Sequence, residues 1–139
     1  MSTENLIQSS PEKGTEKHPL HAEVEAAYNA SDIERWISLY EENAVLQSRS
    51  ADGLAIGRQQ IRKIFERFIA LRGSLAAETV YAVEAYDHVL LRGKFSLSYT
   101  DNDGKLEELI ANTVEVAKRG SDGHWRFIID HGNGAGQFE

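Results

Sequence analysis

Apolar residues recur at helical spacing in the first third of the chain. Four positions at spacing i, i+4, i+7 and i+8 form one helical face: Leu20, Val24, Ala27 and Tyr28. A second helical series follows residues 31–34, where Ser31 and Glu34 have the spacing of a capping box. The pattern therefore predicts two short helices before residue 42, the second of them capped by Ser31.

The clearest helical pattern lies between Gly57 and Gly73. Its apolar stripe is formed by Ile61, Ile64, Phe65 and Phe68. Charged side chains occupy the opposite face, and Gly73 is suited to end the helix. We therefore predict a third helix here, preceded by a short strand over residues 44–48 and a turn at 50–53.

From residue 75 onward the apolar positions alternate, as they do in strands. The predicted strands cover residues 75–86, 89–99, 106–118 and 124–131. Glycine-containing turns at 101–104 and 120–123 are short, which favours antiparallel neighbours. Helices followed by a meander of strands predict an α+β domain with the helices on one face of the sheet.

Alternation along the last strand predicts which of its side chains enter the interior. One face would carry Trp125, Phe127, Ile129 and His131. We expect this face to lie under the helices, so that Asp130 points to the outer face and an Asp130–His131 dyad would need a bulge. His131 is then the candidate acid–base residue, because imidazole titrates near neutral pH. The alternative is a structural histidine that a backbone carbonyl satisfies.

The preceding strand carries polar side chains on both of its predicted faces. Asn112 interrupts an apolar row made of Ile110, Val114 and Val116. An amide in such a row needs a partner, which could be a ligand, a neighbouring strand or water. Glu115 falls on the other face, and we interpret it as a solvated residue or a dimer contact.

Composition and charge narrow the classes of function. The 139 residues suit one domain, and the net charge of -7 argues against binding to nucleic acid phosphates or anionic lipid headgroups. With no cysteine, thiolate chemistry and cysteine-based zinc sites are excluded. The histidines lack the spacing of a zinc site, so no metal or cofactor is expected.

The two ends of the chain have few residues to bury. We expect residues 1–18 and 133–139 to be flexible tails around a single domain spanning 19–132. No apolar run approaches the ~20 residues of a membrane span, and the first residues lack the apolar core of a secretory signal. A cytoplasmic protein is the resulting expectation.

Three segments together resemble one known superfamily. Residues 32–45 (DIERWISLYEENAV) resemble the second helix and first strand of nuclear transport factor 2-like proteins, and residues 57–61 (GRQQI) resemble the entry to their third helix. Residues 123–131 (GHWRFIIDH) are similar to the closing strand of the SnoaL-like and ketosteroid-isomerase-like branch. The resemblance covers roughly residues 20–132, with the segments in the family order.

The resemblance implies a cone-shaped barrel, in which three helices close over a strongly curved, mixed and mainly antiparallel sheet. It further implies a pocket for a small apolar molecule and a homodimer formed through the outer sheet face. Members include isomerases, cyclases and hydratase-like enzymes as well as non-catalytic domains, so fold alone does not choose the function. In the ketosteroid-isomerase pattern a carboxylate base follows the first strand, where this chain has Gln47 and Ser48.

Two hypotheses follow for the pocket. In the first, the chain is an enzyme acting on a small carbonyl- or enol-containing molecule, with His131 as the catalytic acid or base. The residues expected to bind the substrate are Tyr28, Gln47, Phe65, Tyr81, Phe95, Tyr99, Asn112, Trp125 and Phe127. In the second, the missing carboxylate marks a non-catalytic ligand-binding or homodimeric assembly domain. The aromatic residues also have an alternative role as ordinary core.

Overall fold

The computed structural model describes residues 16–48 and 53–135. Within these ranges the helices are α2 (Pro19–Asn29), α3 (Ile33–Ile37) and α4 (Arg58–Ala70). The strands are β1 (Tyr40–Gln47), β2 (Leu54–Ile56), β3 (Ser74–Ala85), β4 (His88–Thr100), β5 (Leu106–Arg119) and β6 (Trp125–His131). Residues 50–52 of the predicted turn and most of the predicted tails lie outside the described residues.

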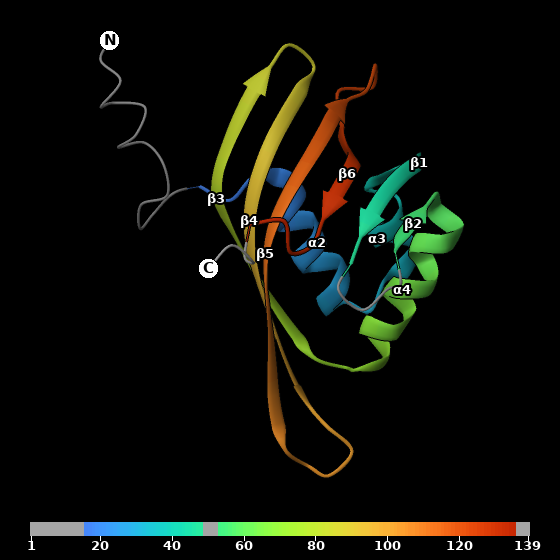
Figure 1. Ribbon diagram of the computed structural model, residues 1–139, viewed down its shortest axis with the longest axis vertical. Coiled ribbons are helices and arrows are strands. Elements are labelled where there is room, and N and C mark those ends of the chain that lie inside the picture. The colour runs from blue at the N-terminus through green and yellow to red at the C-terminus, as the bar shows by residue number, and fades with distance from the viewer. Residues whose placement is uncertain (1–15, 49–52, 136–139) are drawn as a thin grey trace.

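The strands form one mixed sheet in the order β2-β1-β6-β5-β4-β3. Only the β1–β6 pair is parallel among the described strands, and the other neighbours are antiparallel. The three helices lie on one side of this sheet (Figure 1). We call the sheet face toward the helices the inner face and the opposite one the outer face. The predicted α+β class and the mixed, mainly antiparallel sheet are confirmed, although β2 and β3 remain edges and the sheet does not close into a barrel.

Helix starts follow local hydrogen bonding, with one difference from the prediction. Asp32, not Ser31, caps α3, and its side chain accepts a hydrogen bond from the Arg35 amide at 3.1 Å. Ser31 instead has a φ of 54°, in the left-handed region. Glu34 does not complete a capping box, because its carboxylate pairs with Arg62 across α3 and α4 at 2.6 and 2.9 Å.

An irregular step in β6 changes which of its side chains face the helices. Phe127 pairs with Ala117 on β5, whereas Ile129 pairs with the adjacent Val116. Ile128 is therefore an extra residue on β6, which is the pattern of a β-bulge. Because a bulge shifts the alternation by one residue, Phe127 and Asp130 both lie on the inner face and Ile129 lies on the outer face.

The main core lies between the inner sheet face and the helices. Phe127 and Leu91 are fully buried there, under helical residues such as Ile61 and Val24. Within the described residues, no helix is long and apolar enough to cross a membrane. The core leaves one side of the inner face unfilled, and the candidate site lies there.

Candidate active site

A cavity of about 460 Å³ lies between the helices and the inner face of the sheet. All three helices and every strand except β2 contribute side chains to its wall. Its volume falls in the range of small-molecule sites. Most of the wall is apolar, and its polar side chains come chiefly from β5, β6 and the segments that follow β1 and β6.

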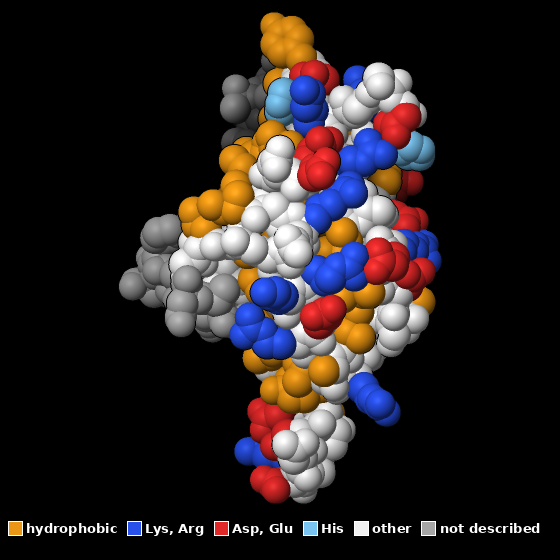
Figure 2. Space-filling view, turned by 90° about the vertical axis from the view of Figure 1, so that its right-hand side faces the viewer, with side chains coloured by type: hydrophobic (Ala, Val, Ile, Leu, Met, Phe, Trp, Pro, Cys, Tyr) orange, Lys and Arg blue, Asp and Glu red, His pale blue; other side chains and the backbone are white. Residues whose placement is uncertain are grey.

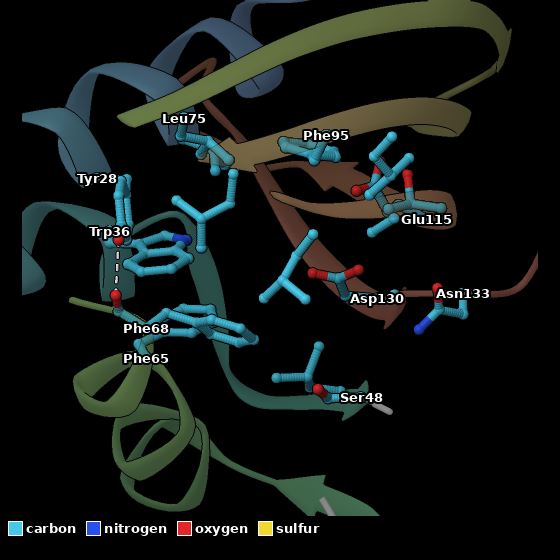
Figure 3. A pocket seen from close by; sticks show the side chains of 18 of the residues that line it. Tyr28, Trp36, Ser48, Phe65, Phe68, Leu75, Phe95, Glu115, Asp130 and Asn133 are labelled. Carbon is cyan, nitrogen blue, oxygen red and sulfur yellow. Dashed lines mark hydrogen bonds between the residues drawn. The ribbon is translucent and has the colours of Figure 1, made fainter. Parts of the chain in front are cut away.

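One end of the cavity, the aromatic end, is made of Tyr28, Trp36, Phe65 and Phe68 (Figure 3). The Trp36 ring stacks on Phe65 with 3.7 Å between centroids and 5° between planes. Tyr28 meets Trp36 edge-on at 5.6 Å, and its hydroxyl donates to the Phe68 carbonyl at 2.6 Å. These contacts fix the position of each ring, so the aromatic end is a rigid wall.

The opposite side of the cavity carries two acidic residues, Glu115 and Asp130, which we call the carboxyl pair (Figure 3). The two residues are direct cross-strand partners on β5 and β6. Their exposed fractions are only 2% and 8%. Side chains directly opposite in an antiparallel pair have Cβ atoms about 5 Å apart, so two negative charges here would repel strongly.

Asp130 is held by a tyrosine of β1. The Tyr40 hydroxyl donates to Asp130 Oδ2 at 2.5 Å, and Tyr40 is itself buried. The ring of Tyr40 packs against Phe127 at 4.9 Å between centroids. Because β1 and β6 are parallel neighbours, this bond also ties the two strands together at the cavity wall.

Glu115 is held by a fully buried histidine of α2. His21 Nε2 lies 2.6 Å from Glu115 Oε1, and His21 Nδ1 lies 2.7 Å from the Thr79 hydroxyl. That hydroxyl also accepts from the His18 amide at 2.8 Å. A neutral imidazole carries one proton, so His21 donates to one of these two partners and accepts from the other.

Burial moves the pKa values of these groups toward their uncharged forms. It raises the pKa of Glu115 to about 8 and lowers that of His21 to about 4. It also raises the pKa of Asp130 to about 7, with the charge of Glu115 adding to the rise and the Tyr40 hydrogen bond opposing it. Near pH 7 the histidine is therefore neutral, and the pKa values of both carboxyl groups lie close to neutral pH.

This arrangement can do acid–base chemistry. A carboxyl group with a pKa close to neutral can take up and return a proton with little cost in either direction. A neighbouring carboxylic acid that stays protonated can donate a hydrogen bond to a developing negative charge. Two acidic residues with different neighbours thus acquire different roles.

Three of the predicted substrate-binding residues line the cavity, namely Tyr28, Phe65 and Phe95. Phe127 is completely buried in the core behind Tyr40, and Trp125 is half-buried next to His18 and Arg119. Neither of these two belongs to the cavity wall. Part of the predicted set of binding residues therefore lies in the wall of this cavity.

The remaining predicted binding residues lie outside the cavity wall. The Gln47 amide donates to the Gly53 carbonyl at 3.4 Å, and Tyr81 lies under the Arg92 guanidinium, 5.7 Å from its ring centre. Tyr99 packs against the edge of the core. Asn112 lies on the face of β5 that carries Val114, and its main-chain carbonyl accepts from Ala135.

The expected facing of the last two residues of β6 is wrong. Strict alternation predicts His131 inside and Asp130 outside, but the extra residue Ile128 reverses them. Asp130 lies in the cavity wall, whereas His131 is exposed and pairs with Gln47 and Val114. The bulge that an Asp130–His131 dyad would require is present, but it turns Asp130 to the inner face and His131 to the outer face.

The expected facing of β5 is wrong as well. Glu115, interpreted above as solvated, is one of the largest fully buried side chains. The residues of β5 on the inner face are Thr113, Glu115 and Ala117, while Val114 and Val116 lie on the outer face. The prediction assumed that the apolar side of β5 would be the buried one. In the structure that apolar side is the outer face.

His21 and Tyr40 are functional candidates that the sequence did not single out. His21 follows Leu20 in α2 and shares its buried face, and Tyr40 begins β1 four residues before the predicted strand. The available signal was the mismatch of a histidine and a glutamate within apolar segments, since buried ionisable groups need a partner. Among residues 16–48 and 53–135, no cluster of three or more histidine or acidic residues is placed to hold a metal ion.

Comparison with known proteins gives the same architecture. No curated protein matches the chain. A ketosteroid isomerase-like protein from Erwinia carotovora atroseptica SCRI1043 superposes with a TM-score of 0.65 at 18% identity, over 82% of this chain and 95% of that one. An NTF-2 like protein of unknown function from Shewanella oneidensis MR-1 gives a TM-score of 0.67 at 15% identity, over 94% and 98%.

A third similar structure is a putative calcium/calmodulin dependent protein kinase II association domain from Xanthomonas campestris. It has a TM-score of 0.65 and 24% identity, over 77% of this chain and 76% of that one. At these identities the likeness concerns the fold. The SnoaL-like domain family matches residues 21–128, which is most of the chain and includes His21, Tyr40 and Glu115 but ends before Asp130. The chain therefore belongs to the SnoaL-like domain family, and it shares the fold of the NTF-2 like and ketosteroid isomerase-like structures.

Proposed function

We propose that the cavity is the active site of a cofactor-independent enzyme that moves a proton on a small, mostly apolar molecule with a carbonyl or enol group. Isomerisation, cyclisation and hydration all require such a step. The observation that carries the proposal is Asp130, a buried carboxyl group in the cavity wall with a pKa of about 7. A purely structural aspartate gains nothing from being held next to a second acid.

In the proposed step the Asp130 carboxylate removes a proton from the carbon next to the substrate carbonyl. The electron pair of that C–H bond forms the enolate double bond, and the negative charge moves to the oxygen. In this step Glu115 is protonated and donates a hydrogen bond to the oxygen from Oε2, while Oε1 keeps its contact with His21 Nε2. Asp130 then returns the proton to the same molecule, so the step needs no oxidant.

Hydrogen–deuterium exchange at the α carbon of 2-tetralone tests the proton transfer without knowledge of the natural substrate. In deuterated water the protein is expected to accelerate this exchange, followed by proton NMR. Asp130→Asn should reduce the catalysed rate by about 10²–10⁴-fold. Asp103→Asn, in the exposed turn before β5, is the matched control and should leave the rate unchanged.

The pH profile gives an independent reading of the same group. The catalysed exchange rate should rise with an apparent pKa of about 7 as Asp130 loses its proton. Equal rates for wild type and Asp130→Asn at every pH would refute the acid–base role and leave a binding pocket.

A second proposal concerns assembly, because one observation favours it. We propose that the outer sheet face forms a homodimer interface. One line of cross-strand partners runs through all six described strands and is apolar throughout: Ile56, Val45, Ile129, Val116, Leu90 and Val83. We call it the apolar row. By contrast, acidic and basic side chains are interspersed on the side of the molecule where α4 lies (Figure 2).

Sedimentation velocity at micromolar concentration tests the dimer. Ile129→Lys places a charge in the middle of the apolar row, where Ile129 is 49% exposed, and should convert the dimer to monomer. Tyr86→Lys alters a residue that is 97% exposed, in the turn between β3 and β4, and should remain dimeric. A wild-type monomer at this concentration would contradict the proposal.

A further inference from the structure

The aromatic end of the cavity contains a polar group that the proposed proton transfer does not use. Trp36 is 7% exposed, and its indole Nε1 has no hydrogen-bond partner among the described residues. The indole nitrogen is a donor only. In Figure 3 it points into the cavity, away from α3.

The surrounding side chains cannot satisfy this donor. The Tyr28 hydroxyl, which belongs to the same end of the cavity, already donates to the Phe68 carbonyl and accepts from the Gly73 amide at 3.2 Å. Phe65 offers only its ring face, on which Trp36 is stacked. Rotation of the indole would break both ring contacts, so the donor is held in one direction.

A ligand supplies what is missing here better than water does. A buried water needs two to four polar partners, and the aromatic end offers this one donor. A ligand atom needs only to accept one hydrogen bond while its apolar part covers the rings. Among the residues that the structure describes, the cavity wall has no basic side chain, which favours an uncharged accepting atom.

We propose that Trp36 Nε1 binds an uncharged acceptor oxygen of the substrate, such as a carbonyl, ester or ether oxygen. The inference rests on the proposed function, which places the reacting carbonyl or enol at the carboxyl pair. Trp36 and Asp130 lie on opposite sides of the cavity (Figure 3). The substrate class is therefore an elongated apolar molecule with two oxygen functions at separate ends, and Trp36 determines specificity for the second one.

Two probes of similar shape test the second acceptor. 1,4-Diacetylbenzene has a carbonyl at each end, whereas 4-isopropylacetophenone has an alkyl group in place of one of them. The ratio of their dissociation constants, measured by NMR titration, reports how much the second carbonyl contributes to binding. In Trp36→Phe this ratio should shift by about five- to tenfold against the diketone, as expected for loss of one hydrogen bond.

Trp125→Phe is the matched control, because Trp125 lies outside the cavity wall. It should change the ratio by less than twofold. In the same variant Trp36 is the single tryptophan, so its indole N–H resonance is assigned directly. That resonance should move downfield with 1,4-diacetylbenzene and not with 4-isopropylacetophenone, which tests the contact even if Trp36→Phe fails to fold.

Several results would overturn the proposal. These are an unchanged ratio in Trp36→Phe, an equal shift of the indole resonance with both probes, and failure of wild type to bind the diketone up to its solubility limit. Asp130→Asn should keep the wild-type ratio while losing the exchange of 2-tetralone. If Asp130→Asn keeps its exchange rate but the ratio still depends on Trp36, the acid–base function fails and the acceptor site stands.

Discussion

The inner and outer faces of β5 and β6 differ both in their surroundings and in the side chains that they carry. On the inner face, Glu115 and Asp130 are buried under the helices, next to a cavity. On the outer face, the adjacent residues Val116 and Ile129 form the equivalent cross-strand pair, and Ile129 is half exposed. The chain thus buries two acids and exposes apolar side chains one position away.

This difference shows that burial of the carboxyl pair has to be maintained by specific partners. The hydrophobic effect alone would favour Val116 and Ile129 as the inner pair. His21 and Tyr40 supply hydrogen bonds to the two acids, and the high pKa values reduce the charge that has to be buried. An arrangement that opposes hydrophobic burial is typical of a functional site.

The largest expected effect tests how strongly the inner face depends on packing. Phe127→Ala should lower the free energy of unfolding by about 3–5 kcal/mol, because it removes a completely buried ring that packs on Tyr40. Ile129→Ala, two residues away on the outer face, should cost about 1 kcal/mol or less. Denaturant unfolding measures both at low protein concentration, and equal losses would contradict the assignment of faces.

The next effect concerns the charge on the inner face. Because the folded-state pKa of Glu115 is raised from 4.5 to about 8, its contribution to stability is present in full below pH 4.5 and is lost as the pH rises through 8. Glu115→Gln cannot ionise, and it can still accept from His21. It should be more stable than wild type by about 1–3 kcal/mol at pH 9.

Thermal unfolding from pH 5 to pH 9 measures this difference. The matched control is Glu108→Gln, at an exposed position of β5, whose stability should follow the wild-type pH dependence. If Glu115→Gln loses stability between pH 5 and pH 9 as steeply as wild type does, another group is responsible for the pH dependence.

The smallest expected effect concerns the influence of Tyr40 on the pKa of Asp130. The Tyr40 hydrogen bond lowers the pKa of Asp130, so its removal in Tyr40→Phe should raise that pKa further, by about one unit. The midpoint of the exchange rate of 2-tetralone should then move to higher pH. Tyr28→Phe removes a hydroxyl at the other end of the cavity, and the midpoint should stay in place.

The sequence was a good guide to the elements and to their order. Helical spacing located the three helices, and the alternation of Val89, Leu91 and Leu97 identified a strand whose apolar side is buried. It did not reveal β2, which is only three residues long. Short strands carry too few positions for a periodic pattern to stand out.

The candidate site was predicted less well, for two physical reasons. Facing was derived from strict alternation, and a bulge such as that at Ile128 has no unique sequence signature. The sequence also does not show that His21 and Glu115 are hydrogen-bond partners, because they are 94 positions apart. The resemblance predicted the fold in which this cavity lies, but the polar residues in the cavity wall became apparent only from the structure.

The extra residue Ile128 also affects how relatives of this chain should be aligned. One inserted or deleted residue in this strand decides whether the aspartate or the histidine of the dipeptide Asp130–His131 faces the cavity. The dipeptide itself looks the same in a sequence alignment in both cases. A gap placed one column away would therefore transfer a catalytic label to a side chain on the wrong side of the sheet. Superfamily members that share this dipeptide should be grouped by strand register before any residue role is transferred between them.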